Sequence, residues 1–107
     1  MTTLPIACNL PEPELARRLH ELRARVAAEV HEIRELDDGL ALRFPPDARW
    51  IRELAEIVIA ERECCPFLTF ELRAEPGLGP VWLHLRGPEG TRAFLLQNLG
   101  LDPHRGR

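Results

Sequence analysis

The sequence contains no lysine, no serine and no tyrosine, and these absences exclude several kinds of chemistry. Without lysine there is no amine for a Schiff base and no lysine for a phosphate-binding loop. Without serine there is no serine nucleophile. Apart from histidine, every basic side chain is an arginine.

Long hydrophobic runs and blocks of like charge are also absent. No apolar stretch approaches the roughly 20 residues of a membrane span, and the first eight residues lack the charged and hydrophobic regions of a signal peptide. The net charge of -3 arises from interleaved Arg and Glu, so no basic stripe offers a surface to nucleic acid or to an anionic membrane. We therefore expect a cytoplasmic protein with neither kind of partner.

The hydrophobic pattern predicts an α+β fold. The 107 residues suit one domain, 1–107, with a core of ordinary size. Helices are expected at 12–28, 48–64 and 91–99, and strands at 30–36, 40–44, 67–74 and 81–86. The order α-β-β-α-β-β-α, with one apolar face on each hairpin, predicts a two-layer domain in which helices cover one face of a four-stranded antiparallel sheet. We expect 1–10 to form an extended N-terminal segment and 100–107 a flexible tail.

The second predicted helix has clear boundaries. Asp47 is the expected N-cap and Pro66 should end the helix. The apolar stripe of this helix is predicted to comprise Trp50, Ile51, Leu54, Ile57 and Val58, followed by Cys64 or Cys65. In the next strand, Leu68, Phe70 and Leu72 alternate with polar residues and should share one face.

The three cysteines are the main candidates for chemistry. Cys64 and Cys65 are adjacent, at the end of the second helix, and Cys8 is distant in sequence. In a reducing compartment, an odd number of cysteines indicates metal-binding, reactive or buried thiols rather than a disulfide framework. The negative end of the helix dipole disfavours a thiolate at this position unless Arg62 folds back to offset it. A soft metal ion needs no such help, because it brings its own positive charge.

Adjacent cysteines argue against a zinc site, because tetrahedral zinc sites usually leave two or more residues between ligands. A vicinal pair fits trigonal As(III) better, and one of its members could instead join a distant thiol around Hg(II). Cys8 is the only candidate for that distant thiol. Glu61, one helical turn before Cys65, is expected beside the sulfur as a weak ligand or as a proton acceptor. The predicted metal site is therefore Cys8, Cys64, Cys65 and Glu61, with no cofactor required.

Three alternatives remain open. The cysteines can be plain core residues, because unpaired cysteine is often buried as a small hydrophobe. They can also form a thiol-redox pair in which Cys8 resolves a sulfenic acid on Cys65. In the third, the cysteines are structural and the protein is a small interaction module. This module would be a homodimer through the outward sheet face around Trp82, where His84, Glu71 and Arg73 are neighbours.

Two motifs carry a resemblance to a known group. Residues 6–10, IACNL, and 61–68, ERECCPFL, together with GPEG at 87–90, resemble small uncharacterised bacterial proteins that occur beside mercury- or arsenic-resistance genes. The likeness spans nearly the whole chain and implies that Cys8, Cys64 and Cys65 match the three cysteines of that group. It favours a protein that sequesters a soft ion, or passes it to a metal-resistance reductase or regulator.

Overall fold

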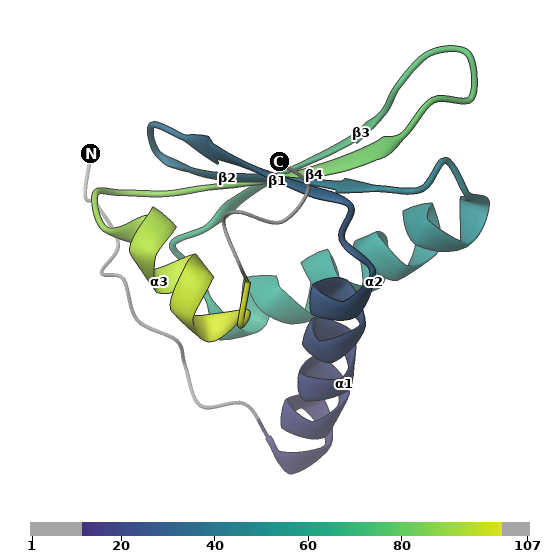
Figure 1. Cartoon of the computed structure of the whole chain (residues 1–107). Coiled ribbons are helices and arrows are strands. Elements are labelled where there is room, and N and C mark those ends of the chain that lie inside the picture. The colour runs from purple at the N-terminus through teal and green to yellow at the C-terminus, as the bar shows by residue number, and fades with distance from the viewer. Residues whose placement is uncertain (1–11, 102–107) are drawn as a thin grey trace.

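The computed structural model describes residues 12–101 and confirms the predicted α+β fold. Within this part of the chain, three helices and four strands follow the order α-β-β-α-β-β-α (Figure 1). The elements are α1 (Pro13–Glu29), β1 (Glu32–Leu36), β2 (Gly39–Phe44), α2 (Ala48–Cys64), β3 (Thr69–Ala74), β4 (Val81–Arg86) and α3 (Thr91–Asn98).

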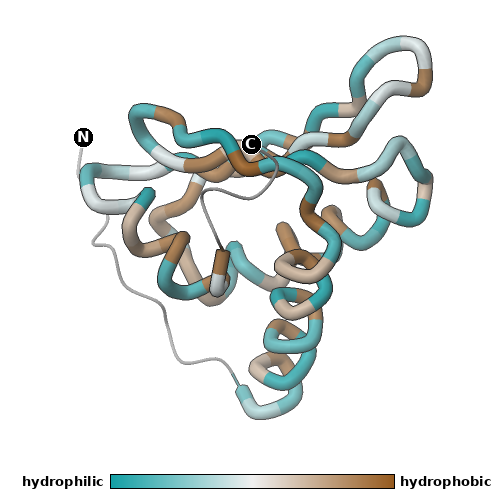
Figure 2. Tube along the Cα trace, in the orientation of Figure 1, coloured by the Kyte–Doolittle hydropathy of each residue, from teal (hydrophilic) through white to brown (hydrophobic). Residues whose placement is uncertain are grey.

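The four strands form one antiparallel sheet in the order β1-β2-β4-β3. The helices lie together on one face of this sheet, and none of the helices in residues 12–101 lies on the other face (Figure 1). Alternate residues of the strands point into the helical layer. Leu42 lies between Ile33 of β1 and Leu83 of β4 in the register, and all three are almost completely buried. Figure 2 shows the resulting alternation of hydrophobic and hydrophilic residues along the strands.

The second helix begins and ends where the sequence predicts. The Asp47 side chain accepts a hydrogen bond from the backbone N–H of Arg49 at 2.9 Å, which caps α2. The buried stripe runs through Trp50, Leu54 and Ile57. Ile51, which was predicted to belong to it, is 41% exposed. It follows Trp50 directly, and the 100° turn between successive helical residues carries its side chain away from the sheet.

Leu72 keeps its predicted face but is partly exposed, whereas Leu101 departs from the predicted flexible tail. Leu72 shares the helix-facing register with buried Leu83 but is 40% exposed, because β3 is an edge strand of the sheet. At the other end of the chain, Leu101 belongs to the hydrophobic core, and its N–H bonds to the carbonyl of Leu96 at 3.2 Å. The rest of the predicted flexible tail, the N-terminal segment and Cys8 lie outside residues 12–101.

No helix in the described part of the chain has both the length and the hydrophobicity of a membrane span. The core instead joins one stripe of each helix to one face of the sheet. In α1 the buried stripe is Leu19, Leu22 and Val26. Because α1 and α2 pack against each other as well as below the sheet, side chains that are distant in sequence meet between them.

Candidate metal centre

Glu61, Cys64 and Cys65 form a compact group at the end of α2. Residues three and four positions apart share one side of a helix, so Glu61 lies beside both cysteines. One carboxylate oxygen and the two sulfur atoms all lie within 4.8 Å of one another. The three residues are 5%, 5% and 1% exposed, respectively. Neither cysteine forms a disulfide with another described residue. The group could hold a metal ion.

The end of α2 sets the direction of Cys65. Its backbone N–H still bonds to the Glu61 carbonyl at 2.6 Å, but its φ of −122° and ψ of 78° are no longer helical. Pro66 follows, and the chain turns toward β3 through a hydrogen bond from the Leu68 N–H to the Cys65 carbonyl. The Cys65 sulfur donates to a Glu61 carboxylate oxygen at 3.6 Å. The proximity of Glu61 to Cys65 predicted from sequence is therefore confirmed.

The structure adds a residue that sequence analysis missed. Arg23 of α1 forms a two-pronged ion pair with Glu61: Nε donates to Oε2 at 2.9 Å and Nη2 donates to Oε1 at 2.7 Å. The same Nη2 lies 3.9 Å from the sulfur of Cys64 and 3.9 Å from that of Cys65. A single cationic nitrogen thus contacts all three members of the group.

This arrangement explains how a carboxylate can remain buried. An unpaired buried carboxylate is costly, and a guanidinium that meets it with two parallel N–H groups offsets that cost. The hydrogen bonds to Glu61 raise the pKa of Arg23 above its already high usual value; burial opposes this rise, and electrostatic interactions with Glu61, Cys65 and Cys64 add to it. Arg23 therefore stays charged, and its field favours negative charge on the neighbouring sulfurs.

The source of positive charge differs from the one expected. Arg62 was the candidate to offset the helix dipole, but it is exposed and Arg23 lies at the sulfurs instead. The sequence does carry a signal for Arg23. It stands four residues after Leu19 and three before Val26, and so falls within the helical spacing of the buried α1 stripe. A charged residue at such a position usually needs a partner on the facing element.

Two predicted site features remain to be placed. Cys8 lies outside the described residues, so its approach to the cluster stays a prediction. Trp82 lies on the outward sheet face as predicted but is only 7% exposed, since the guanidinium of Arg34 covers its ring at 4.6 Å. The ring therefore offers little apolar area to a second protein molecule, and the predicted dimer remains untested.

The site has two thiols and a carboxylate, a donor set that suits soft metal ions. Two sulfur ligands of one zinc ion are at most two bond lengths apart, about 4.6 Å, so atoms within 4.8 Å of one another need at most a small movement to share an ion. Chain comparisons add no family: no protein-family model, curated protein or solved structure matches this chain.

Proposed function

We propose that this protein binds a soft thiophilic ion, Hg(II) or As(III), through Cys64 and Cys65. The observation that carries the proposal is the closeness of the two sulfurs and the Glu61 carboxylate, within 4.8 Å of one another in a buried setting. Thiolate ligands select soft ions, and burial limits the access of competing small thiols. Zinc is the poorer match, because adjacent cysteines are unusual in its tetrahedral sites.

Cys8 supplies the third thiol in this proposal. Leu15 in the first turn of α1 and Glu63 in the last turn of α2 line the same surface groove, so the chain enters α1 near the cysteine end of α2. From residue 15 back to residue 8, an extended chain covers at most about 24 Å. This length supports an approach of Cys8 to the cluster. Three thiolates would complete a trigonal As(III) site, with Glu61 as a neighbouring carboxylate.

The biological role that we propose is metal resistance in the cytoplasm. The protein would sequester the ion or pass it to a reductase or a regulator. The support for this role is the resemblance of the IACNL and ERECCPFL segments to proteins encoded beside mercury- or arsenic-resistance genes. Arg23 fits transfer as well as storage, because its guanidinium can neutralise the thiolates again when the ion leaves.

Native mass spectrometry tests the proposal directly. The protein is mixed with one equivalent of Hg(II) or arsenite in the presence of excess glutathione. We expect retention of the ion, and loss of retention in Cys64→Ala and Cys65→Ala. Cys8→Ala should weaken As(III) retention more than Hg(II) retention, with Asn9→Ala as its matched control. Stripping of both ions by glutathione from the unmodified protein would refute the proposal.

Arg23 favours a second candidate, a thiol-redox function. A guanidinium 3.9 Å from both sulfurs stabilises the thiolate, which is the nucleophilic form of cysteine. The Cys65 thiolate would attack a hydrogen peroxide oxygen, breaking the O–O bond to give a sulfenic acid and a hydroxide, which takes a proton from solvent to become water. A second thiol, Cys8 or Cys64, would then form a disulfide and release another water.

The two candidates respond differently to peroxide. In the redox candidate, one equivalent of hydrogen peroxide yields a single intramolecular disulfide that dithiothreitol reverses, and Arg23→Met slows its formation. Peptide mapping identifies the partner thiol. If peroxide produces only slow, mixed oxidation while ion retention is strong, the metal-binding function stands alone.

A further inference from the structure

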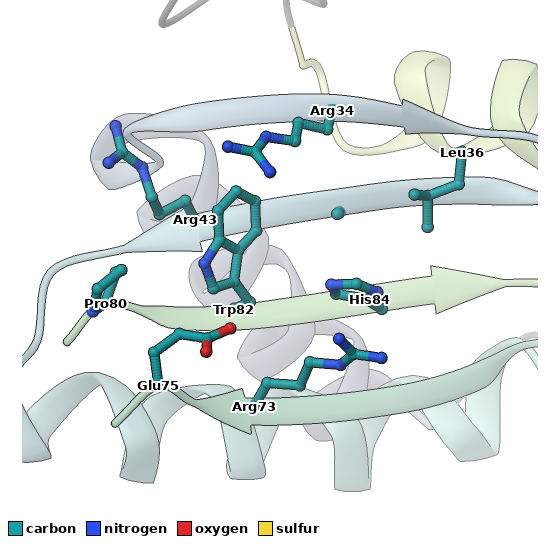
Figure 3. A pocket seen from close by; sticks show the side chains of 9 residues that line it. Arg34, Leu36, Arg43, Arg73, Glu75, Pro80, Trp82 and His84 are labelled. Atoms are coloured by element: carbon teal, nitrogen blue, oxygen red, sulfur yellow. The ribbon is translucent and has the colours of Figure 1, made fainter. Parts of the chain in front are cut away.

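The face of the sheet opposite the helices contains a groove of about 400 Å³. All four strands contribute to it (Figure 3): Arg34 from β1, Ala41 and Arg43 from β2, Arg73 from β3, and Trp82 and His84 from β4. Helix α2 and its thiols lie on the other side of the sheet. The groove is therefore separate from the candidate metal centre.

Strand register explains why this face is hollowed. Ala41 lies directly between Arg34 of β1 and His84 of β4 in the sheet, and its single methyl group leaves space between two longer side chains. Arg43 lies next to Trp82, and Trp82 next to Arg73, in the adjacent row. The indole ring of Trp82 extends from β4 across β2 toward the guanidinium of Arg34 (Figure 3).

The residues that line the groove carry mainly positive charge, although the whole chain is negative. The protein has a net charge of -3, yet three guanidinium groups line the groove and Glu75 is the only carboxylate among the lining residues. His84 adds no charge near neutral pH, because burial and the positive charge of Arg73 lower its pKa below the usual value. Among the lining residues alone, positive charges outnumber negative ones by two, and this count leaves out the neighbouring carboxylates Glu32 and Glu71.

Carboxylates at the rim hold the guanidinium groups in place. Glu32 pairs with Arg34 at 2.5 Å and with Arg43 at 3.3 Å. Glu71 pairs with Arg73 at 3.3 Å. A guanidinium has five N–H donors, so these contacts leave further donors on each group. The Arg43 Nε is buried and faces the Glu32 carboxylate without meeting hydrogen-bond geometry, so the donors left for a ligand are those of the Nη groups.

We propose that this groove binds a small organic phosphate monoester as its dianion. Its charge of about −2 at neutral pH would face three guanidinium groups that keep N–H donors beyond their pairs with Glu32 and Glu71. Arginine binds phosphate oxygens through paired N–H groups. The volume falls within the range of small-molecule sites and exceeds the need of inorganic phosphate, so space remains in the groove for an organic group.

Isothermal titration calorimetry with phenyl phosphate tests this inference on the full chain. Benzoate is the monoanionic comparison ligand, and phenol is the neutral one. We expect saturable binding of phenyl phosphate, weaker binding of benzoate and none of phenol. Added salt should weaken the binding, because the attraction is mainly between charges. Equal binding of benzoate, or no saturable heat with phenyl phosphate, would overturn the proposal.

Variants separate the groove from general surface charge. Arg73→Gln should weaken phenyl phosphate binding by roughly tenfold, through loss of a charge-assisted hydrogen bond. Ala41→Leu should abolish phenyl phosphate binding, because the larger side chain fills the groove. This substitution changes no charge. Arg17→Gln is the matched control, since Arg17 is exposed on α1 and pairs with Glu21. Circular dichroism establishes that each variant is folded.

Two more results decide between occupants of this face. If sedimentation shows a dimer that Ala41→Leu dissociates, and phenyl phosphate does not bind, the face is an interface between copies and the phosphate proposal is wrong. If Cys64→Ala/Cys65→Ala loses metal retention but binds phenyl phosphate unchanged, the groove is an independent site. If Arg73→Gln and Arg17→Gln weaken phenyl phosphate binding equally, the proposal that the groove is the binding site is also wrong.

Discussion

Arg23 and Glu61, 38 residues apart, form a two-pronged ion pair between α1 and α2, and the Arg23 Nη2 that binds Glu61 also contacts both sulfurs. This nitrogen lies where all three candidate ligands converge, the position that a bound cation would share. In the absence of an ion, Arg23 therefore supplies the positive charge that the buried carboxylate requires. An incoming metal ion must displace this side chain or bind beside it.

Replacing Arg23 by methionine should destabilise the fold. Glu61 would remain buried without a charged partner, and we expect a loss of about 2 kcal/mol in the free energy of unfolding. Urea denaturation measures the change through the transition midpoint. The double variant Arg23→Met/Glu61→Leu should recover most of the loss, because a hydrophobic pair of similar volume can replace a buried ion pair.

Arg17→Gln provides the control for the loss of an arginine from α1. Its ion pair with Glu21 is exposed, so the change should stay within about 0.5 kcal/mol. An Arg23→Met protein as stable as the unmodified chain would contradict the assigned role of the Arg23–Glu61 pair.

The Arg23–Glu61 pair also shows where sequence reasoning reaches its limit. Asp47 and Pro66 define α2 through local hydrogen bonding and backbone restriction, so its bounds were predictable. Helical spacing likewise put Glu61 beside Cys65. Arg23, however, becomes part of the site only when α1 packs against α2, and no local pattern specifies which face of α2 it meets. The strand order β1-β2-β4-β3 was open for the same reason: pairing between two hairpins is a long-range choice.

Trp82 illustrates a different limit. Alternation along β4 correctly placed it on the outward face, yet exposure depends on the side chains of the neighbouring strands. Arg34, two strands away, covers the ring through a cation–π contact. Periodicity assigns a face to a residue. The burial of that residue within the face follows from tertiary neighbours that periodicity does not identify.

His84 should titrate below its ordinary pKa of 6.5, because burial disfavours the imidazolium and Arg73 repels it. The unfolded chain then binds a proton more readily than the folded protein, so stability is fully present above pH 6.5 and falls as the pH drops toward the folded pKa. NMR titration of the imidazole measures the shift. Arg73→Gln should raise this pKa toward the ordinary value, and an unchanged titration would contradict the assigned contribution of Arg73.

Metal binding should release fewer protons than there are coordinating thiols. Thiols lose their protons when they bind a metal, so ordinary thiols release one proton each. In this protein the Arg23 Nη2 lies 3.9 Å from both sulfurs and its charge favours thiolates, so we expect part of that release to precede the arrival of the ion. A pH-stat titration with Hg(II) at neutral pH counts the released protons. Arg23→Met should raise the count toward one proton per thiol, whereas Arg17→Gln should leave it unchanged. Identical counts in the unmodified and Arg23→Met proteins would mean that Arg23 serves the Glu61 carboxylate alone and leaves the sulfurs protonated.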